Sequence, residues 1–212
     1  MRTSDLAVPE LAAIDVQGMT RGAFIVRGAL AAGAVYGGAA VGPFVGQALA
    51  QASGDVDVLN FALTLEFLEA EFYKQALKEV DDLDSEVKEL AEEIEKNEAE
   101  HVDTLTQTIE QLGGKPTKAP EVDFGDAFRS QDAFLKLALT FEDTGVSAYN
   151  GAAPRIKSEE VLGAAGAIVQ VEARHAALIA HHTNGKIAPS GAFDKPLGQE
   201  KVLKAVEPFV KS

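Results

Sequence analysis

The chain has 212 residues and no cysteine, and its 33 acidic side chains outnumber 19 basic ones to give a formal net charge of −14. This acidity argues against nucleic acid as a partner, because phosphate binding needs clustered positive charge. The lack of cysteine excludes disulfides, thiolate nucleophiles and iron–sulfur ligation. Any metal bound by this chain must therefore be held by carboxylate and imidazole groups.

An uncharged segment from Gly28 to Gly54, rich in glycine and alanine, follows the basic residues Arg21 and Arg27. A basic start, an apolar stretch and a small-x-small sequence at residues 48–50 are typical of a cleaved secretory signal. We therefore expect residues 1–50 to be an export signal that is cleaved near its end. The protein would then be located in the periplasm, at the cell surface or outside the cell.

Residues 20–25 resemble a twin-arginine signal, except that Gly22 stands where the second arginine is expected. The alternative is a retained membrane anchor or a mobile arm. Glycine, alanine and Pro43 give this segment a weak driving force for spanning a bilayer. We expect contact with a membrane only if the segment is retained, and Met19 is a second candidate for the start of the chain.

Four segments of the remaining chain repeat apolar side chains at spacings of three and four, which predicts helices with one buried face. These segments cover residues 55–80, 85–112, 130–152 and 158–184. We expect Asp55 or Asp57 to cap the first helix, and Ser85, Ser130 and Ser158 to cap the other three. The glycines at 113–114 and 185 predict where the second and fourth helices end.

The links between these helices alternate in length. Short links join the first pair and the second pair, while the link from Gly113 to Arg129 has 17 residues and contains proline and glycine. This order predicts an all-α four-helix bundle with one long crossover between helices two and three. The bundle would occupy residues 51–185. In the tail, residues 186–212, a short amphipathic helix over 199–210 could pack on the bundle or on a neighbouring subunit.

Each of the four apolar stripes is interrupted near its middle by ionisable side chains. Because an unpartnered buried charge costs several kcal/mol, four such interruptions need a common explanation. Glu98 and His101 lie three residues apart, a spacing at which both can reach one divalent ion, and a second Glu-x-x-His pair follows on the fourth helix. The predicted metal ligands are Glu66, Glu98, His101, Glu142, Glu172 and His175. The alternative is a buried polar network without metal.

The pattern is also an internal repeat, since Tyr73 follows Glu66 by seven residues and Tyr149 follows Glu142 by seven. The two tyrosines are candidate catalytic residues that hydrogen-bond site carboxylates or carry a radical. The alternative is that they are packed aromatic residues. Glu69 shares the stripe of Glu66, and it could be an outer acid, a shifting carboxylate ligand or a polar position near the end of the bundle.

Residues 55–185 resemble the ferritin-like superfamily of di-metal carboxylate proteins, which includes bacterioferritin, rubrerythrin and manganese catalase. The segments 59–73, 141–149 and 171–177 are most similar to exported bacterial ferritin-like-domain proteins, some of them associated with desiccation stress. The resemblance implies that Glu98 and Glu172 bridge two metal ions. It further implies that Glu66 and His101 complete one metal position, and that Glu142 and His175 complete the other.

This resemblance implies a site for two divalent ions, with iron favoured and manganese possible, that reacts with dioxygen or hydrogen peroxide. The expected function is an oxidoreductase of the ferroxidase or peroxidase type that protects against iron or oxidative stress. Manganese in the same ligands would suggest a catalase-like reaction. A stress-associated structural protein without turnover and an iron-storage cage are two further possible functions. A homodimer or a larger homo-oligomer is possible, but only the storage cage requires a large symmetric shell.

Overall fold

The computed structural model describes residues 43–188 and 191–211, with side chains from residue 54 onward. Most of the expected export signal, including the possible start at Met19, lies outside these residues. Within the described part, the chain is helical apart from its links and one isolated bridge between Val122 and Val210. None of the helices in this part combines the length and the apolar character needed to cross a membrane.

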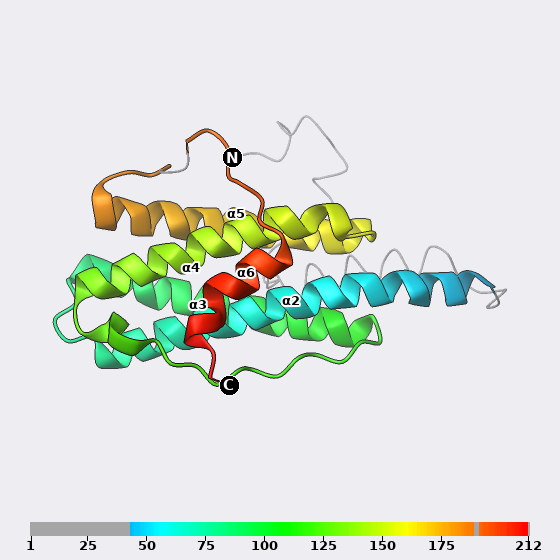
Figure 1. Cartoon of the computed structure of the whole chain (residues 1–212), viewed down its shortest axis with the longest axis horizontal. Helices are drawn as coiled ribbons and strands as arrows, with labels where there is room; N and C mark the ends of the chain where they lie inside the picture. Colours follow the sequence, from blue (N-terminus) through cyan, green and yellow to red (C-terminus); the bar gives the residue numbers. More distant parts are fainter. Residues whose placement is uncertain (1–42, 189–190, 212) are drawn as a thin grey trace, which may run out of the picture. The chain divides into compact units, whose positions relative to one another are not determined.

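Four long helices form two pairs, α2 with α3 and α4 with α5 (Figure 1). Their bounds are Pro43–Glu79 for α2, Ser85–Gln111 for α3, Gln131–Ala152 for α4 and Glu159–Asn184 for α5. The link between α3 and α4 is the long one. The predicted ferritin-like bundle with one crossover between the second and third helices is therefore confirmed.

Four of the predicted helix ends have the expected local structure. Ser130 and Ser158 each accept a hydrogen bond from the backbone three residues on, which caps α4 and α5 as expected. Gly185 ends α5 with a φ of 72°, the left-handed conformation that glycine adopts without a steric penalty. Gly113, with a φ of 75°, follows the end of α3 in the same way.

Two predicted caps were wrong. Because α2 begins at Pro43, Asp55 lies inside this helix, and its carboxylate accepts hydrogen bonds of 2.9 Å from the backbone nitrogens of Lys157 and Ser158. At α3 the cap position is Asp84, one residue before Ser85, and its side chain makes no capping bond. Asp84 instead forms two hydrogen bonds of 2.7 Å with Gln131 at the start of α4.

The crossover is attached to both α2 and the end of the chain. Asn60 on α2 donates to the carbonyl of Lys115 and accepts from the backbone nitrogen of Thr117. Further along, the backbone of residues 121–123 bonds to that of residues 209–211. A short 3-10 helix, η3 (Gly125–Phe128), then brings its apolar side chains into the core.

The tail after residue 190 packs against the bundle through the helix α6 (Gln199–Val206) and the 3-10 helix η5 (Glu207–Phe209). Val202 and Val206 of α6 are buried. Before α6, the backbone nitrogen of Leu197 donates to the carbonyl of Ser147 on α4. A Cβ at Gly151 would lie 1.9 Å from the carbonyl oxygen of Leu197, so only glycine permits this close crossing.

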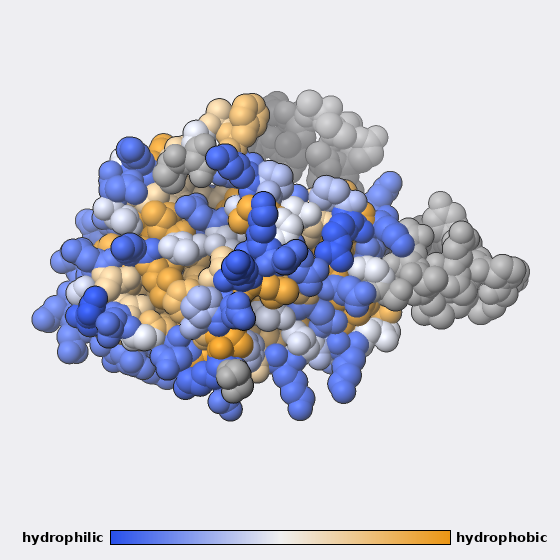
Figure 2. Space-filling model, in the orientation of Figure 1, coloured by the Kyte–Doolittle hydropathy of each residue, from blue (hydrophilic) through white to orange (hydrophobic). Residues whose placement is uncertain are grey.

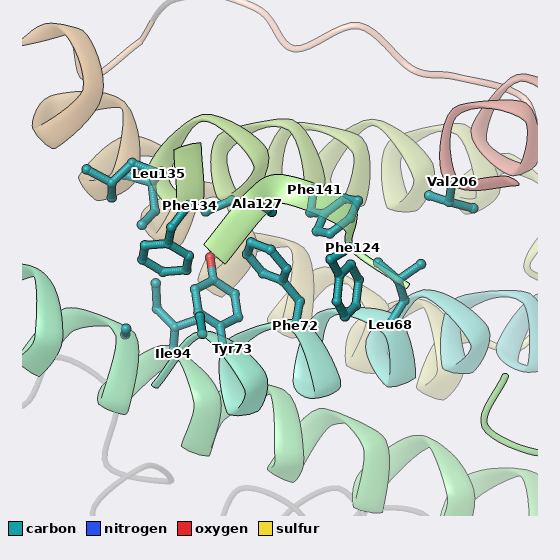
Figure 3. Packing of buried hydrophobic residues seen from close by; sticks show 14 of the residues in the cluster. Leu68, Phe72, Tyr73, Ile94, Phe124, Ala127, Phe134, Leu135, Phe141 and Val206 are labelled. Atoms are coloured by element: carbon teal, nitrogen blue, oxygen red, sulfur yellow. The ribbon is translucent and has the colours of Figure 1, made fainter. Parts of the chain in front are cut away.

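Two apolar clusters fill the bundle. The larger one is rich in aromatic residues, and Figure 3 shows Phe72, Phe124 and Phe141 lying together between α2 and α4. The smaller one surrounds Leu63 and Leu105. On the outer face seen in Figure 2, hydrophilic side chains predominate around the edge of the bundle, with apolar residues between them. Most of the buried polar groups lie in the middle of the bundle, between these two apolar clusters.

Candidate metal centre

All six predicted ligands lie in the middle of the bundle, one set on each helix. Glu66 comes from α2, Glu98 and His101 from α3, Glu142 from α4, and Glu172 and His175 from α5. The four glutamates are 0% exposed, and the two histidines are 7% and 4% exposed. Helical geometry explains the arrangement on α3, because Ile94, Glu98, His101 and Leu105 follow one another on the buried face at spacings of three and four.

The six side chains form two overlapping groups of four. In the first, ligand atoms of Glu66, Glu98, His101 and Glu172 all lie within 4.8 Å of one another, and the same holds in the second for Glu98, Glu142, Glu172 and His175. Glu98 and Glu172 belong to both groups. Each group also has one glutamate and one histidine of its own. This is the arrangement that two neighbouring cations with two shared carboxylates would require.

In the first group, the ligand atoms converge on one shared point and do not form separate hydrogen-bonded pairs. Nδ1 of His101 lies 3.0 Å from oxygens of both Glu66 and Glu172, and 3.2 Å from an oxygen of Glu98. One ring nitrogen carries at most one proton, so it cannot donate good hydrogen bonds to three carboxylates at once. A cation at the shared point would contact all four groups.

The second group leaves polar atoms without partners. Nδ1 of His175 lies 3.0 Å from Oε1 of Glu98 and 3.3 Å from Oε2 of Glu142. Within the described part of the chain, none of these three atoms has a hydrogen-bond partner of suitable geometry, and neither oxygen of Glu172 has one. Buried polar atoms are rarely left in this state. Metal coordination would satisfy them, and a set of four carboxylates and two imidazoles suits iron or manganese.

Burial and mutual repulsion change the acidity of these groups. Burial raises the pKa of Glu172 well above its ordinary value, and the charges of Glu98 and Glu66 raise it further. Burial also raises the pKa of Glu98, to about 7, although both histidines oppose this rise. Burial raises the pKa of Glu66 as well, but hydrogen bonding and the charge of His101 outweigh it, so the net pKa is lowered.

The pKa values of the two histidines shift so as to favour the charged form of each ring. Burial lowers the pKa of His175, but the nearby carboxylates of Glu142 and Glu98 overcome this effect and raise it to about 10. Burial likewise opposes the charged form of His101, whereas Glu172, Glu66 and Glu98 raise its pKa. Without a metal ion, the cluster therefore holds protons that partly neutralise its carboxylates.

Each of the two candidate catalytic tyrosines contacts a carboxylate that belongs to the other half of the internal repeat. The hydroxyl of Tyr73 on α2 donates a hydrogen bond to Glu142 on α4, and that of Tyr149 on α4 donates to Glu66 on α2. Burial raises the pKa of both hydroxyls well above the ordinary value, and the neighbouring carboxylates add to this shift. Each tyrosine therefore remains a protonated donor that holds one carboxylate in place.

Two further residues reach the site. Glu69, whose role the sequence leaves open, is only 3% exposed and lies one helical turn from Glu66. The amide of Asn97 lies 3.1 Å from Nε2 of His175, on the side of the ring that faces away from the carboxylates. Asn97 was missed because it is half-buried and lies next to Glu98, off the apolar stripe of α3. Only the packing of α3 against α5 brings it to His175.

Fold and site together define a ferritin-like four-helix bundle with a buried cluster of glutamates and histidines that resembles a di-metal carboxylate site. A model of the ferritin-like domain family matches residues 54–185, and the chain therefore belongs to that family. No match was found among curated proteins.

Solved structures of similar fold include two bacterial proteins. One is described as a ferritin-like, diiron-carboxylate protein from Bacillus anthracis, with 20% identity, a TM-score of 0.56, and coverage of 63% of this chain and 98% of that one. The other is a conserved hypothetical protein from Mycobacterium tuberculosis, with 16% identity, a TM-score of 0.55, and coverage of 70% of this chain and 98% of that one. At these identities the likeness concerns the fold alone.

Proposed function

We propose that this protein binds two metal ions, iron in preference to manganese, and reacts with dioxygen or hydrogen peroxide in protection against iron or oxidative stress. The observation that carries the proposal is the sharing of Glu98 and Glu172 by two four-residue groups. The four glutamates of these groups carry four negative charges when ionised, which matches the charge of two divalent ions. Two imidazoles then complete the ligand set without adding charge.

The chain's residues have distinct roles in this proposal. Glu98 and Glu172 would hold both ions, and each of the other four ligands would hold one. Two bound Fe(II) ions would supply the two electrons that reduce one hydrogen peroxide to two waters, with the uptake of two protons. Tyr73 and Tyr149 fix the terminal carboxylates by hydrogen bonds. The apolar clusters on both sides of the site exclude bulk water from it.

Metal content per chain is the primary test. Protein purified without added metal is analysed by mass spectrometry, and then loaded anaerobically with Fe(II) and exposed in separate samples to dioxygen and to peroxide. We expect about two metal ions per chain and oxidation of both iron ions. The faster of the two reactions identifies the substrate.

The same experiment separates the remaining candidate functions. Peroxide disproportionation by the manganese-loaded protein, with oxygen released, would favour a catalase-like reaction. Metal binding that raises the melting temperature without any turnover would indicate a structural, stress-associated protein. Failure to bind metal, with no change in melting temperature, would overturn the di-metal proposal.

Export from the cytoplasm is a separate part of the proposal. Two observations support it: the basic residues Arg21 and Arg27 precede an uncharged segment, and three segments of the chain are similar to exported ferritin-like proteins. Intact mass measurement of the protein recovered from each cell fraction tests it. Recovery of the full-length chain from the cytoplasm alone would contradict export.

A further inference from the structure

An open groove lies on the outer side of the α2–α3 pair, where the crossover and the end of the chain form its other walls. Its volume is about 560 Å³, which is in the range of small-molecule binding sites. Apolar side chains from α2, α3 and the crossover line it, among them Phe67, Val102 and Val122. A concave site of this size suits a small molecule better than it suits the surface of a partner protein.

The groove lies directly behind the metal centre. Three of its residues each follow a site ligand in the sequence, and these are Phe67, Ala99 and Val102, which follow Glu66, Glu98 and His101. The three ligands are buried, whereas their neighbours in the groove are half-buried or exposed. A helix with its side chains is about 10–12 Å across, so the backbones of α2 and α3 are the main separation between groove and ligands.

The proposed reaction needs an external source of electrons. Reduction of one hydrogen peroxide takes two electrons from two Fe(II) ions, so a second turnover requires that both ions be reduced again. The chain has no cysteine, which excludes an iron–sulfur cluster or a dithiol of its own as the donor. Because electron transfer slows steeply with distance, an external donor must bind close to the ions. The groove is a site of suitable size in such a position.

The charge of the groove restricts which donor can bind. Four carboxylates and two ammonium groups line it, those of Glu71, Glu95, Asp103, Glu121, Lys74 and Lys211. Lys74 is already paired with Glu71 at 2.9 Å. The excess of negative charge opposes reductants that carry phosphate groups, such as nicotinamide and flavin nucleotides. An uncharged, largely apolar donor with hydroxyl groups suits both the apolar lining and the carboxylates, which accept hydrogen bonds.

We propose that this groove binds a neutral hydroquinone, which restores the divalent state of the oxidised metal pair. The inference rests on the proposed function. A hydroquinone gives up two electrons and two protons as its two hydroxyl groups become the carbonyl groups of a quinone. Two Fe(III) ions take up one electron each, which accounts for both electrons. The protons pass to carboxylates of the groove, such as Glu95, and from there to water.

The test uses menadione to measure binding and its hydroquinone, menadiol, to measure reaction. Calorimetry measures menadione binding to the full chain loaded with two metal ions, with NADH as the phosphate-bearing comparison. Anaerobic stopped-flow absorbance then measures how fast menadiol reduces the iron of the Fe(III)-loaded protein. We expect one menadione to bind per chain, NADH not to bind, and one menadiol to reduce both iron ions.

Substitution of two exposed alanines fills the groove, Ala99 on α3 and Ala119 on the crossover. We expect Ala99→Trp and Ala119→Trp each to weaken menadione binding and to slow reduction by menadiol at least about tenfold, with the metal content unchanged. Ala119→Trp keeps the proposal testable if Ala99→Trp disturbs the neighbouring Glu98. The matched control is Ala167→Trp, an exposed position on α5 outside the groove, which should leave both quantities as in the wild type.

The outcomes distinguish this inference from the function on which it rests. A wild-type chain that binds two metal ions and oxidises them, but binds no menadione, overturns the inference and leaves the proposed function in place. Menadione binding and iron reduction that neither tryptophan changes would locate the donor elsewhere, which also overturns the inference. A wild-type chain that binds no metal overturns both proposals, since a bound hydroquinone would then have no electron acceptor.

Discussion

Tyr149 on α4 donates a hydrogen bond to Glu66 on α2, while Tyr73 on α2 donates one to Glu142 on α4. The two bonds cross between the halves of the internal repeat. Each half therefore fixes the terminal carboxylate of the other, and both bonds link α2 directly to α4 at the level of the site. A donor that orients a metal ligand strengthens metal binding without itself being a ligand.

Removing either hydroxyl should weaken metal binding without unfolding the protein. We expect Tyr149→Phe to lower affinity roughly 10- to 100-fold for the ion held by Glu66, and Tyr73→Phe to do the same for the ion held by Glu142. Stepwise Mn(II) titration followed by electron paramagnetic resonance measures this. If both variants bind two ions as tightly as the wild type, the tyrosines are only packed aromatic residues.

The shared carboxylates should matter more than the histidines for metal stoichiometry. Because Glu98 belongs to both ligand groups, Glu98→Ala should lose both ions, whereas His101→Ala should lose mainly one. Metal content by mass spectrometry after loading and desalting gives the result. Glu93→Ala, on the exposed side of α3, is the matched control and should retain two ions. Full metal content in Glu98→Ala would show that this residue is not a bridging ligand.

Metal binding should release protons and weaken at low pH. Without metal, Glu98 has a pKa of about 7 and Glu172 a raised pKa, while the histidines are protonated because the pKa of His175 is about 10 and that of His101 is also raised. A metal ion must displace these protons, so lowering the pH from about 8 to about 6 should reduce affinity. Calorimetry in two buffers of different ionisation enthalpy counts the protons released. Affinity that rises as the pH falls would contradict this assignment.

The sequence predicted the four helices and the convergence of six ionisable residues, because helical periodicity determines which side chains share a face. Ile94, Glu98, His101 and Leu105 occupy one stripe of α3 whatever the helix packs against. The order of short and long links then restricted how the four stripes could meet. Both inferences depend on local geometry and chain connectivity, which a single sequence contains.

The contacts that the sequence did not predict depend on how the helices pack. Asp55 has the residue type of a helix cap, but α2 extends past it, and its carboxylate reaches the start of α5 about a hundred residues later. The partners of the two tyrosines lie on the opposite helices rather than on their own. Glu69 could not be assigned because its neighbours Glu142 and Glu172 lie on other helices and meet it only in the folded bundle.

The contact of Asp55 with the start of α5 should contribute to stability. The carboxylate of Asp55 is only 1% exposed and accepts two part-buried backbone hydrogen bonds, so Asp55→Ala leaves both backbone donors without this acceptor. We expect a loss of about 1–3 kcal/mol in the free energy of unfolding of the metal-free protein, measured by urea titration. Asp57→Ala, on the exposed side of the same helix, should change this free energy by less than about 0.5 kcal/mol. Equal effects of the two substitutions would argue against the contact.

Asn97 should strengthen the binding of a metal ion by His175. Both histidines turn Nδ1 towards the carboxylates, and Nδ1 can bind a metal only if the ring proton is on Nε2. Nδ2 of Asn97 lies 3.1 Å from Nε2 of His175. A half-turn of this amide would place its oxygen there instead, where it accepts a hydrogen bond from Nε2–H. Asn97→Leu should therefore weaken the ion held by His175 roughly tenfold, and Asn97→Asp should preserve its binding. Nitrogen-15 chemical shifts of the imidazole report the tautomer directly, and an unchanged Nε2–H form in Asn97→Leu would exclude this role.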